Sequence, residues 1–270
     1  MDEFSLNVNG CVYDVLIITE TWLCKSIKNE ELALTNYNIY RADRTELTSR
    51  KSRGGGVLIA VNKRMNSSLV FTGDLVESLY ICVNINSTRF IIAGVYIPPN
   101  SDTNIYKSHC NDIEQVFERF SDHKFIIAGD FNLPYINWTE TTDNVIHGYI
   151  GHNQDCYDAF LSTYSFLNLV QVNMTPNNGG VFLDLMFTNI DNLEISSAID
   201  AITCPNHHHI PYSWCVSTDS FIPLEAEFTV FDFVNGNYDL LNSYLSGICW
   251  DECFKDLEIN EMVSVFYNMV

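Results

Sequence analysis

Polar side chains follow several apolar runs of this sequence, at the point where each run stops. The clearest case is residues 126–132, where an apolar stretch ends in Gly-Asp-Phe-Asn and presents Asp130 and Asn132 two residues apart. An acid and an amide in such a turn suit a phosphate or a metal ion, although Gly, Asp and Asn also make plain turns. Two other apolar runs end in the same way, one at Glu20 and one at Tyr96.

A carboxylate also interrupts the apolar run of residues 183–187. Asp184 needs a partner there, because a buried unpaired charge is costly, and the candidate partner lies among the three consecutive His of residues 207–209. Neighbouring side chains of an extended loop point in different directions, which disfavours a transition-metal site built from all three. A hydroxyl, an amide, a His and several carboxylates, without a Cys or Ser nucleophile, fit metal-assisted phosphodiester hydrolysis by an activated water.

The elements that must position these residues are strands that alternate with helices. Short runs rich in branched residues predict strands at residues 15–19, 56–61, 79–85, 90–96, 125–128 and 183–188. Apolar residues near helical spacing predict helices at residues 104–120 and 155–167. This order favours a layered α/β or α+β sandwich. After about residue 232 two amphipathic helical stripes replace the strand pattern, so we expect a boundary near residues 230–236.

The composition describes a folded but strongly acidic chain. Its 270 residues include 34 acidic and 14 basic ones, for a net charge of -20, and 47% are hydrophobic. A chain of this kind can bury a core, which excludes disorder, and it is too acidic for an ordinary nucleic-acid coat protein. The nine cysteines are scattered without a Cys-x-x-Cys pair, which indicates a reducing compartment and argues against zinc.

The charge is unevenly distributed along the chain. Residues 1–124 hold 13 basic and 15 acidic residues, whereas residues 125–270 hold only Lys255 against 19 acids. Residues 41–64 form a local basic window, which is either a set of solvated loop charges or a surface for phosphates. No apolar run of about 18 residues and no signal peptide is visible, so we expect an intracellular protein without a membrane span.

The motifs, taken in order, resemble a known superfamily. ITETWL with Glu20, RGGGVLIAV, GVYIPPN, GDFN and LDLMFTN resemble the endonuclease/exonuclease/phosphatase superfamily, specifically the apurinic/apyrimidinic-type endonuclease domain of insect non-LTR (LINE, jockey-like) retrotransposon polyproteins. The resemblance covers roughly residues 1–218. Residues 240–250 resemble the segment that these polyproteins place between the endonuclease and the reverse transcriptase.

The resemblance implies a four-layered α/β sandwich and Mg²⁺-dependent DNA nicking, with Mn²⁺ as the alternative ion. Glu20 would be the principal metal ligand, and Tyr96 would contact the scissile phosphate. Asp130 would position or deprotonate the attacking water, and Asn132 would fix the phosphate.

It also implies that Asp184 accepts a hydrogen bond from His209 and holds that imidazole charged toward a phosphate oxygen. The basic window would supply contacts to the phosphate backbone of DNA. The window residues assigned to those contacts are Arg41, Arg44, Arg50, Lys51 and Arg53.

Two positions depart from the family pattern. His208 stands where the family has an Asp, so the metal side of the site loses a negative charge. The family opens with a strand that bears an active-site Asn, and Asn7 supplies one only superficially. Only 12 residues separate it from Glu20, and the strand that begins at Val15 uses part of them. A parallel crossover needs about 10 to 12 residues or more. We therefore expect residues 1–13 to correspond to the crossover helix and loop, with the first strand missing.

The sequence thus predicts a retrotransposon-derived endonuclease-like domain at residues 1–232 and a helical connector at residues 233–270, truncated before a reverse transcriptase. DNA would be its partner and the nucleus its compartment if it is active. Two alternatives are a catalytically inactive remnant or protein-binding module of the same fold, and a superfamily phosphatase or lipid phosphodiesterase. We expect Trp22 and Trp138 to be packing aromatics that flank the cleft rather than platforms for bases.

Overall fold

The computed structural model describes residues 2–10, 13–49, 51, 53–140, 146–150, 155–191, 193–198, 209–216 and 237–269. The chain divides into two compact units, Met1–Thr229 and Val230–Val270. The predicted boundary between residues 232 and 233 lies outside the described residues. None of the described helices is long and apolar enough to cross a membrane.

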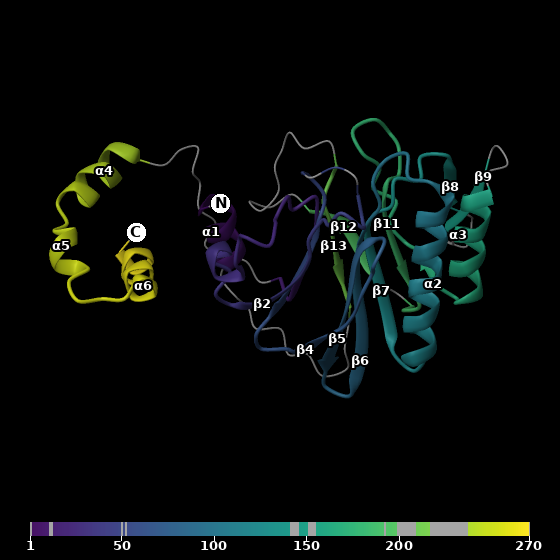
Figure 1. The fold of residues 1–270 in the computed structure, drawn as a ribbon, viewed down its shortest axis with the longest axis horizontal. Coiled ribbons are helices and arrows are strands. Elements are labelled where there is room, and N and C mark those ends of the chain that lie inside the picture. The colour runs from purple at the N-terminus through teal and green to yellow at the C-terminus, as the bar shows by residue number, and fades with distance from the viewer. Residues whose placement is uncertain are drawn as a thin grey trace. The chain divides into compact units, whose positions relative to one another are not determined.

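Two sheets form the centre of the first unit (Figure 1). The larger sheet has the order β10-β11-β7-β6-β5-β4, with β10 Val170–Gln171, β11 Asp184–Thr188, β7 Lys124–Asp130, β6 Thr88–Tyr96, β5 Glu77–Ile85 and β4 Asn66–Thr72. The smaller sheet has the order β1-β3-β2, with β1 Val15–Thr19, β3 Val57–Asn62 and β2 Tyr37–Ala42. Two further antiparallel pairs are β8 Ile136–Glu140 with β9 Ile146–Ile150, and β12 Glu194–Ser197 with β13 Tyr212–Cys215.

The central strands are buried because both of their faces are covered. Between the sheets lies an apolar cluster to which β3 contributes Val57 and Ile59 and β5 contributes Leu79 and Ile81. On the other face of the larger sheet, helices α2 Thr103–Arg119 and α3 Asp155–Phe166 pack over a second cluster. Continuous apolar runs are typical of strands covered on both faces, which is why the sequence predicted these strands.

A third apolar cluster covers the outer face of the smaller sheet. Val8 of helix α1 Asp2–Gly10 packs there with Leu58 and Ala60 of β3, and with Leu32 of the 3-10 helix η1 Asn29–Leu32. The first unit is therefore built of four layers in the order α1, smaller sheet, larger sheet, α2 with α3 (Figure 1). The predicted four-layered α/β sandwich is confirmed, as are the predicted strands and the two predicted helices of this unit.

One connection sets the position of the site. Strands β6 and β7 are parallel neighbours, and α2 makes the crossover between them. Asp102 caps α2, because its carboxylate accepts hydrogen bonds from the backbone N–H groups of Asn104 (2.7 Å) and Ile105 (3.3 Å). Parallel neighbours end at the same edge of a sheet, so the last residues of β6 and β7 come together. In open α/β sheets, ligands bind outside this edge.

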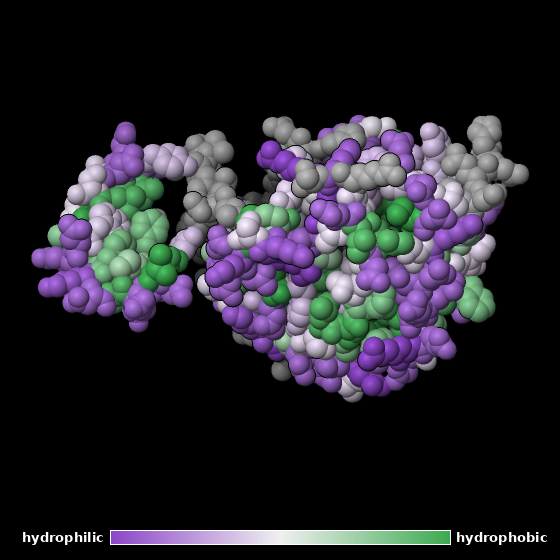
Figure 2. All heavy atoms as spheres, in the orientation of Figure 1, coloured by the Kyte–Doolittle hydropathy of each residue, from purple (hydrophilic) through white to green (hydrophobic). Residues whose placement is uncertain are grey.

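The second unit contains the helices α4 Tyr238–Ser246, α5 Trp250–Cys253 and α6 Ile259–Met269. Helices α4 and α6 confirm the two predicted helical stripes. Trp250 contacts Phe254 and Phe266, with ring centroids 5.3 and 5.6 Å apart. No residue of this unit whose exposure is described is buried, and several large apolar side chains reach its surface (Figure 2).

Candidate active site

Four ionisable side chains stand in one row across the larger sheet. Strand pairing places Glu77 at the start of β5 opposite Tyr96 at the end of β6, and Tyr96 opposite Asp130 at the end of β7. Asp130 in turn lies opposite Asp184 at the start of β11. Directly opposed residues of neighbouring strands share a face of the sheet. Residues from four separate stretches of the sequence therefore line one edge of the sheet on one face.

Glu20 joins this row from the smaller sheet, directly after β1. The hydroxyl of Tyr96 donates a hydrogen bond to its Oε1, and the backbone N–H of Gly55 and the indole N–H of Trp22 each donate to its Oε2 at 2.7 Å. Burial alone would raise the pKa of Glu20, but the hydrogen bonds from these three donors and the Arg44 guanidinium outweigh it and lower the pKa below its ordinary value. Glu20 is therefore held ionised.

The three hydrogen bonds leave the Glu20 carboxylate able to bind one more donor or cation. Each carboxylate oxygen offers about two lone pairs, so the two donors on Oε2 use that oxygen fully. Oε1 accepts one recorded bond, from Tyr96. Within the described part of the chain, the open acceptor position on Glu20 is consequently on Oε1, the oxygen that Tyr96 of the row contacts.

A buried ion pair between Arg44 and Glu77 contacts the same glycine run that binds Glu20. Arg44 donates through Nε to Glu77 Oε1 at 2.6 Å, and the two side chains are only 8% and 0% exposed. Glu77 also accepts hydrogen bonds from the hydroxyl of Thr48 (3.1 Å) and the backbone N–H of Gly56 (2.6 Å). The Arg44 guanidinium lies 5.7 Å from the ring centre of Tyr96. The pair thus joins the loop after β2 to the sheet edge that carries the row.

Gly55 makes this arrangement possible. Its φ is +67°, and a Cβ at this position would lie 2.2 Å from both Arg44 Nη2 and Glu77 Oε2. Only glycine tolerates both the left-handed backbone and the close approach. The run of three glycines in RGGGVLIAV is therefore the sequence feature that lets Gly55 reach Glu20 and leaves space for the ion pair.

Asp130, Asp184 and His209 form the other part of the site. Nδ1 of His209 is hydrogen-bonded to Asp184 Oδ2 at 2.6 Å, as the resemblance implied. One potential ligand atom from each of the three residues lies within 4.8 Å of the others, so they could hold a metal ion. The hydrogen bond to Asp184 raises the pKa of His209 above its ordinary value against the opposing effect of burial, with further help from the charge of Asp130.

Asp130 has the opposite environment to Glu20. It is 4% exposed, and Oδ1 accepts a hydrogen bond from the backbone N–H of Asn132 at 3.1 Å. Burial and the neighbouring negative charge of Asp184 raise the pKa of Asp130 to about 7, although His209 and Asn132 act to lower it. A carboxylate with such a pKa can exchange a proton near neutral pH.

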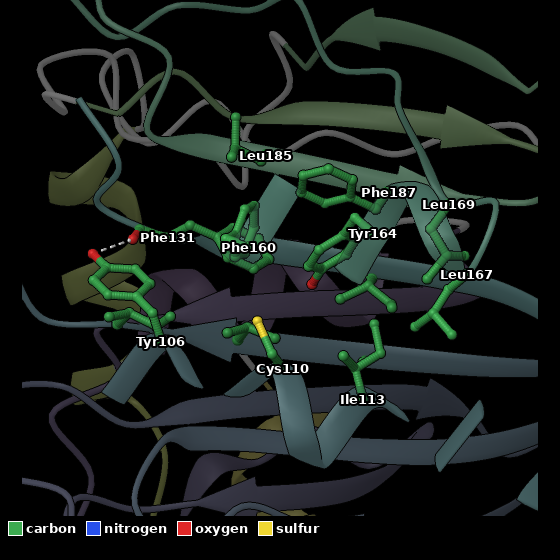
Figure 3. Close-up of a cluster of buried hydrophobic side chains, with 14 of the residues drawn as sticks. Tyr106, Cys110, Ile113, Phe131, Phe160, Tyr164, Leu167, Leu169, Leu185 and Phe187 are labelled. Carbon is green, nitrogen blue, oxygen red and sulfur yellow. Dashed lines mark hydrogen bonds between the residues drawn. The ribbon is translucent and has the colours of Figure 1, made fainter. Parts of the chain in front are cut away.

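Asn132, which was predicted to fix a phosphate, also helps to hold the turn after Asp130. It adopts a left-handed φ of +48°, and its side-chain NH₂ donates to the carbonyl of Ile97 at 2.9 Å. The Tyr106 hydroxyl donates to the carbonyls of Phe131 and Asn132, and Figure 3 shows the first of these bonds beside the buried aromatic cluster. The turn after Asp130 is therefore held between the core and the end of β6. The contact of Asn132 with a phosphate stays a prediction.

Two residues of the predicted basic window form ion pairs inside the protein. Arg41 pairs with Asp43 at 2.5 Å and Arg44 with Glu77, so both act on the loop conformation rather than as free cations. Arg50 lies outside the described residues. Lys51 and Arg53 are exposed, and Arg53 stands beside the Gly54–Gly55 turn of the site. Of the five window residues assigned to phosphate contacts, these two are the described ones that remain exposed.

The remaining predictions have mixed outcomes. Trp138 is 7% exposed and packs in the core, as expected, but Trp22 is 56% exposed, so its assignment as a packing residue is wrong. Asn7 lies in helix α1, where it is 8% exposed, and not at the end of a strand. His208 lies outside the described residues.

Glu77 is a site residue that the sequence prediction missed, although the sequence contains a signal for it. Strands β5 and β6 are joined by a two-residue turn at residues 86–87, which fixes the register of the hairpin. Counting back from that turn places Glu77 opposite Tyr96. A charged residue at the start of an otherwise apolar strand, opposite a site residue, could therefore have been recognised.

The donor atoms at the site suit a hard divalent cation. Carboxylate oxygens dominate, and hard cations prefer oxygen ligands. The open acceptor position on Oε1 of the ionised Glu20, together with Asp130 and Asp184 in the same row, fits such an ion.

Comparison with known proteins gives the following matches. Residues 90–211 match the family model described as endonuclease-reverse transcriptase. No curated protein matches the sequence. Among solved structures, the chain is similar to the endonuclease domain of TRAS1, a telomere-specific non-LTR retrotransposon, with 10% identity and a TM-score of 0.55 over 81% of this chain and 93% of that chain.

Two other solved structures match with lower TM-scores. The human Nocturnin catalytic domain is 15% identical, with a TM-score of 0.46 over 75% of this chain and 81% of that one. A truncated TDP2 from Caenorhabditis elegans is 12% identical, with a TM-score of 0.40 over 79% of this chain and 87% of that one. The family match thus covers a little under half of the chain, and the likeness to the TRAS1 domain, at 10% identity, shows a shared fold.

Proposed function

We propose that the first unit is an endonuclease of the retrotransposon type that nicks DNA by hydrolysing phosphodiester bonds with a divalent cation. The observation that carries the proposal is the row of Tyr96, Asp130 and Asp184 at one sheet edge, completed by Glu20 and His209 from other elements. The match of residues 90–211 to the endonuclease-reverse transcriptase family supports it. The fold shared with a retrotransposon endonuclease domain is consistent with it.

Glu20 would hold the cation, with Mg²⁺ as the first candidate and Mn²⁺ as the alternative. When bound, the cation supplies positive charge that offsets the negative charge developing on the phosphate. Glu20 supports this role because its pKa is lowered and Oε1 retains an open acceptor position. Tyr96 would act mainly by orienting Glu20, because its hydroxyl proton is already donated to that carboxylate.

Asp130 would orient the attacking water and accept its proton. A base must lie next to the reacting water and be able to take up a proton near the working pH, and Asp130 has a raised pKa at the edge of the site. The proton then resides on Asp130 while the water oxygen forms the new bond to phosphorus and the leaving oxygen departs from the opposite side.

His209 would donate a hydrogen bond to a phosphate oxygen through Nε2. Its Nδ1 is bonded to Asp184, which fixes the ring orientation and favours the charged imidazolium. A fixed positive donor stabilises charge that develops on the phosphate oxygens. Arg53 and Lys51 would contact neighbouring phosphates of the DNA strand.

Nicking of supercoiled plasmid tests the proposal. We expect the wild-type protein with Mg²⁺ to convert supercoiled DNA to nicked circles, and we expect both Asp130→Asn and Glu20→Gln to lose most of this activity. Asp158→Asn is the matched control, because Asp158 is an exposed carboxylate of α3. Equal nicking by all four proteins would refute the assignment. Absence of nicking in a well-folded wild-type protein would favour a catalytically inactive member of the fold.

A further inference from the structure

Trp22 is a large aromatic side chain that the structure keeps at the surface beside the site. It is 56% exposed, although it lies only two residues after Glu20. Single exposed apolar residues are ordinary. Trp22 differs from them because both its backbone and its ring are fixed.

The backbone of Trp22 has a left-handed φ of +55°. For a residue other than glycine this conformation costs free energy and persists only where the surroundings impose it. The backbone N–H of Trp22 donates to the carbonyl of Gly55 at 2.8 Å, and that of Thr21 donates to the carbonyl of Gly56 at 3.3 Å. The loop of Trp22 is thus bonded to the glycine run that also contacts Glu20.

The ring is held from two directions. Its Nε1–H donates to Glu20 Oε2 at 2.7 Å, and the guanidinium of Arg53 lies 5.4 Å from the ring centre, in cation–π geometry. Arg53 has no ion pair with any carboxylate among the described residues, in contrast to Arg41 and Arg44. The indole therefore stands in a fixed orientation, with a free cation against it and a site carboxylate at its edge.

We propose that the Trp22 indole is a stacking platform for an unstacked nucleobase of the strand being cut, with Arg53 beside it on the adjoining phosphate. The inference rests on the proposed DNA-cleaving function. Aromatic faces accept any base, since every base has a π surface, and a nearby Arg adds both stacking and phosphate contact. A ring that is already immobilised loses little conformational entropy on binding.

The surroundings favour a nucleotide over an apolar partner. The hydrogen-bond partner of the ring is Glu20 and its cation–π partner is Arg53, and both of these side chains are charged. A protein or lipid surface would have to desolvate these charges to reach the ring. A nucleotide presents its base to the ring and its phosphate to the guanidinium, so that both groups are satisfied together.

Binding measured without metal and without cleavage tests the proposal. The probes are two fluorescein-labelled DNA duplexes, one fully paired and one with a single unpaired adenine, titrated in EDTA and followed by anisotropy. We expect Trp22→Ala to weaken binding of the duplex with the unpaired base by about 5- to 150-fold, which corresponds to about 1–3 kcal/mol per stacked base. Trp22→Phe should retain most of the affinity, because Phe keeps an aromatic face and loses only the N–H donor.

Controls separate stacking from charge and from folding. Phe166→Ala removes another aromatic, 81% exposed at the end of α3, and should leave both affinities unchanged. Arg53→Ala should weaken both duplexes alike and reduce the salt dependence of binding by about one unit of slope. Both Trp22 variants keep a non-glycine residue at φ +55°, so melting temperatures should agree between them. Quenching of tryptophan fluorescence by the duplex with the unpaired base should disappear in Trp22→Phe.

The outcomes are distinguishable. If Trp22→Ala binds both duplexes as tightly as the wild type while the wild type still nicks plasmid, stacking is wrong and the proposed function stands. If Trp22→Phe and Trp22→Ala lose affinity equally, the N–H bond to Glu20 is what matters, and the platform is refuted. A wild-type protein that neither binds the duplexes nor nicks plasmid would refute both proposals.

Discussion

The two halves of the candidate active site treat their carboxylates in opposite ways. Glu20 accepts hydrogen bonds from a phenol, an indole and a backbone amide, and its pKa lies below the ordinary value. The donors to Asp130 among the described residues come from one residue, Asn132. Asp130 is also buried and faces Asp184, so its pKa rises to about 7.

This difference shows that the environment, and not the residue type, assigns the role. A carboxylate surrounded by donors stays charged and can hold a cation at all physiological pH values. A buried carboxylate next to another acid can take up and release a proton. The half around Glu20 is thus built for fixed charge, and the half around Asp130 is built for proton exchange.

The largest effect on the fixed-charge half should come from Gly55→Ala. The new Cβ would lie 2.2 Å from Arg44 Nη2 and Glu77 Oε2, and the left-handed backbone would cost a further amount, of about 1–3 kcal/mol. We expect a lowered free energy of unfolding, measured by urea denaturation, and loss of plasmid nicking.

Gly180→Ala is the matched control. Gly180 has a similar φ of +78°, but no atom lies within 4 Å of a Cβ placed there. Gly180→Ala should therefore lower the free energy of unfolding only by the cost of the left-handed backbone. If the two variants lose equal stability, the collision with the Arg44–Glu77 pair is not what makes Gly55 necessary.

Glu77→Gln should have the next largest effect. It leaves the Arg44 guanidinium buried without its counter-charge, and breaking a buried pair in this way costs about 3–5 kcal/mol. The comparison is Asp14→Asn, which removes the partner of Arg64 in a pair whose side chains are 47% and 35% exposed. That change should cost less than about 1 kcal/mol. Chemical denaturation of both variants measures the contrast, and similar losses would contradict a structural role for the buried pair.

The pH dependence of stability should have opposite signs in the two halves. Glu20 has a lowered pKa, so its contribution to stability is present above its unfolded pKa near 4.5 and is lost as pH falls through the folded value. Asp130 has a raised pKa, so its contribution is present below its unfolded pKa near 3.8 and is lost as pH rises toward about 7.

Melting temperatures of the metal-free protein in EDTA test these signs. Glu20→Gln should lower the melting temperature at neutral pH and match the wild type at the acidic end. Asp130→Asn should raise it above pH about 7 and match the wild type near pH about 4. A common sign for both variants would contradict the division of the site into two halves.

Much of the fold and part of the site could be predicted from the sequence. The central strands are continuous apolar runs and α2 has a clear helical period, so local pattern was sufficient for them. Strand β4 was not predicted. Its exposure pattern is mostly exposed and intermediate, as expected for an edge strand, so no apolar run marks it.

The parts of the site that the sequence did not predict depend on long-range pairing. Glu77 becomes a site residue only through its register with Tyr96, and the internal pairing of Arg44 only through the fold of the loop that brings it to Glu77. The basic window therefore seemed a cationic surface in the sequence, while the structure directs two of its arginines inward. Trp22 is exposed on a left-handed backbone that is hydrogen-bonded to the glycine run, a long-range contact that residue type alone does not indicate.

The smallest and most specific effect concerns His209. Its pKa is raised first by the hydrogen bond with Asp184 and by the charge of that residue, then by the charge of Asp130, and least by that of Glu20. In metal-free protein followed by NMR of the imidazole ring, Asp184→Asn should therefore lower the pKa of His209 most. Asp130→Asn should lower it less, and Glu20→Gln least. Asp122→Asn, which removes the partner of His123, should leave it unchanged. If Glu20→Gln lowered the pKa of His209 as much as Asp184→Asn does, the two halves would act as one electrostatic unit. The expected rank means instead that the protonation of His209 is controlled within the half that contains Asp130.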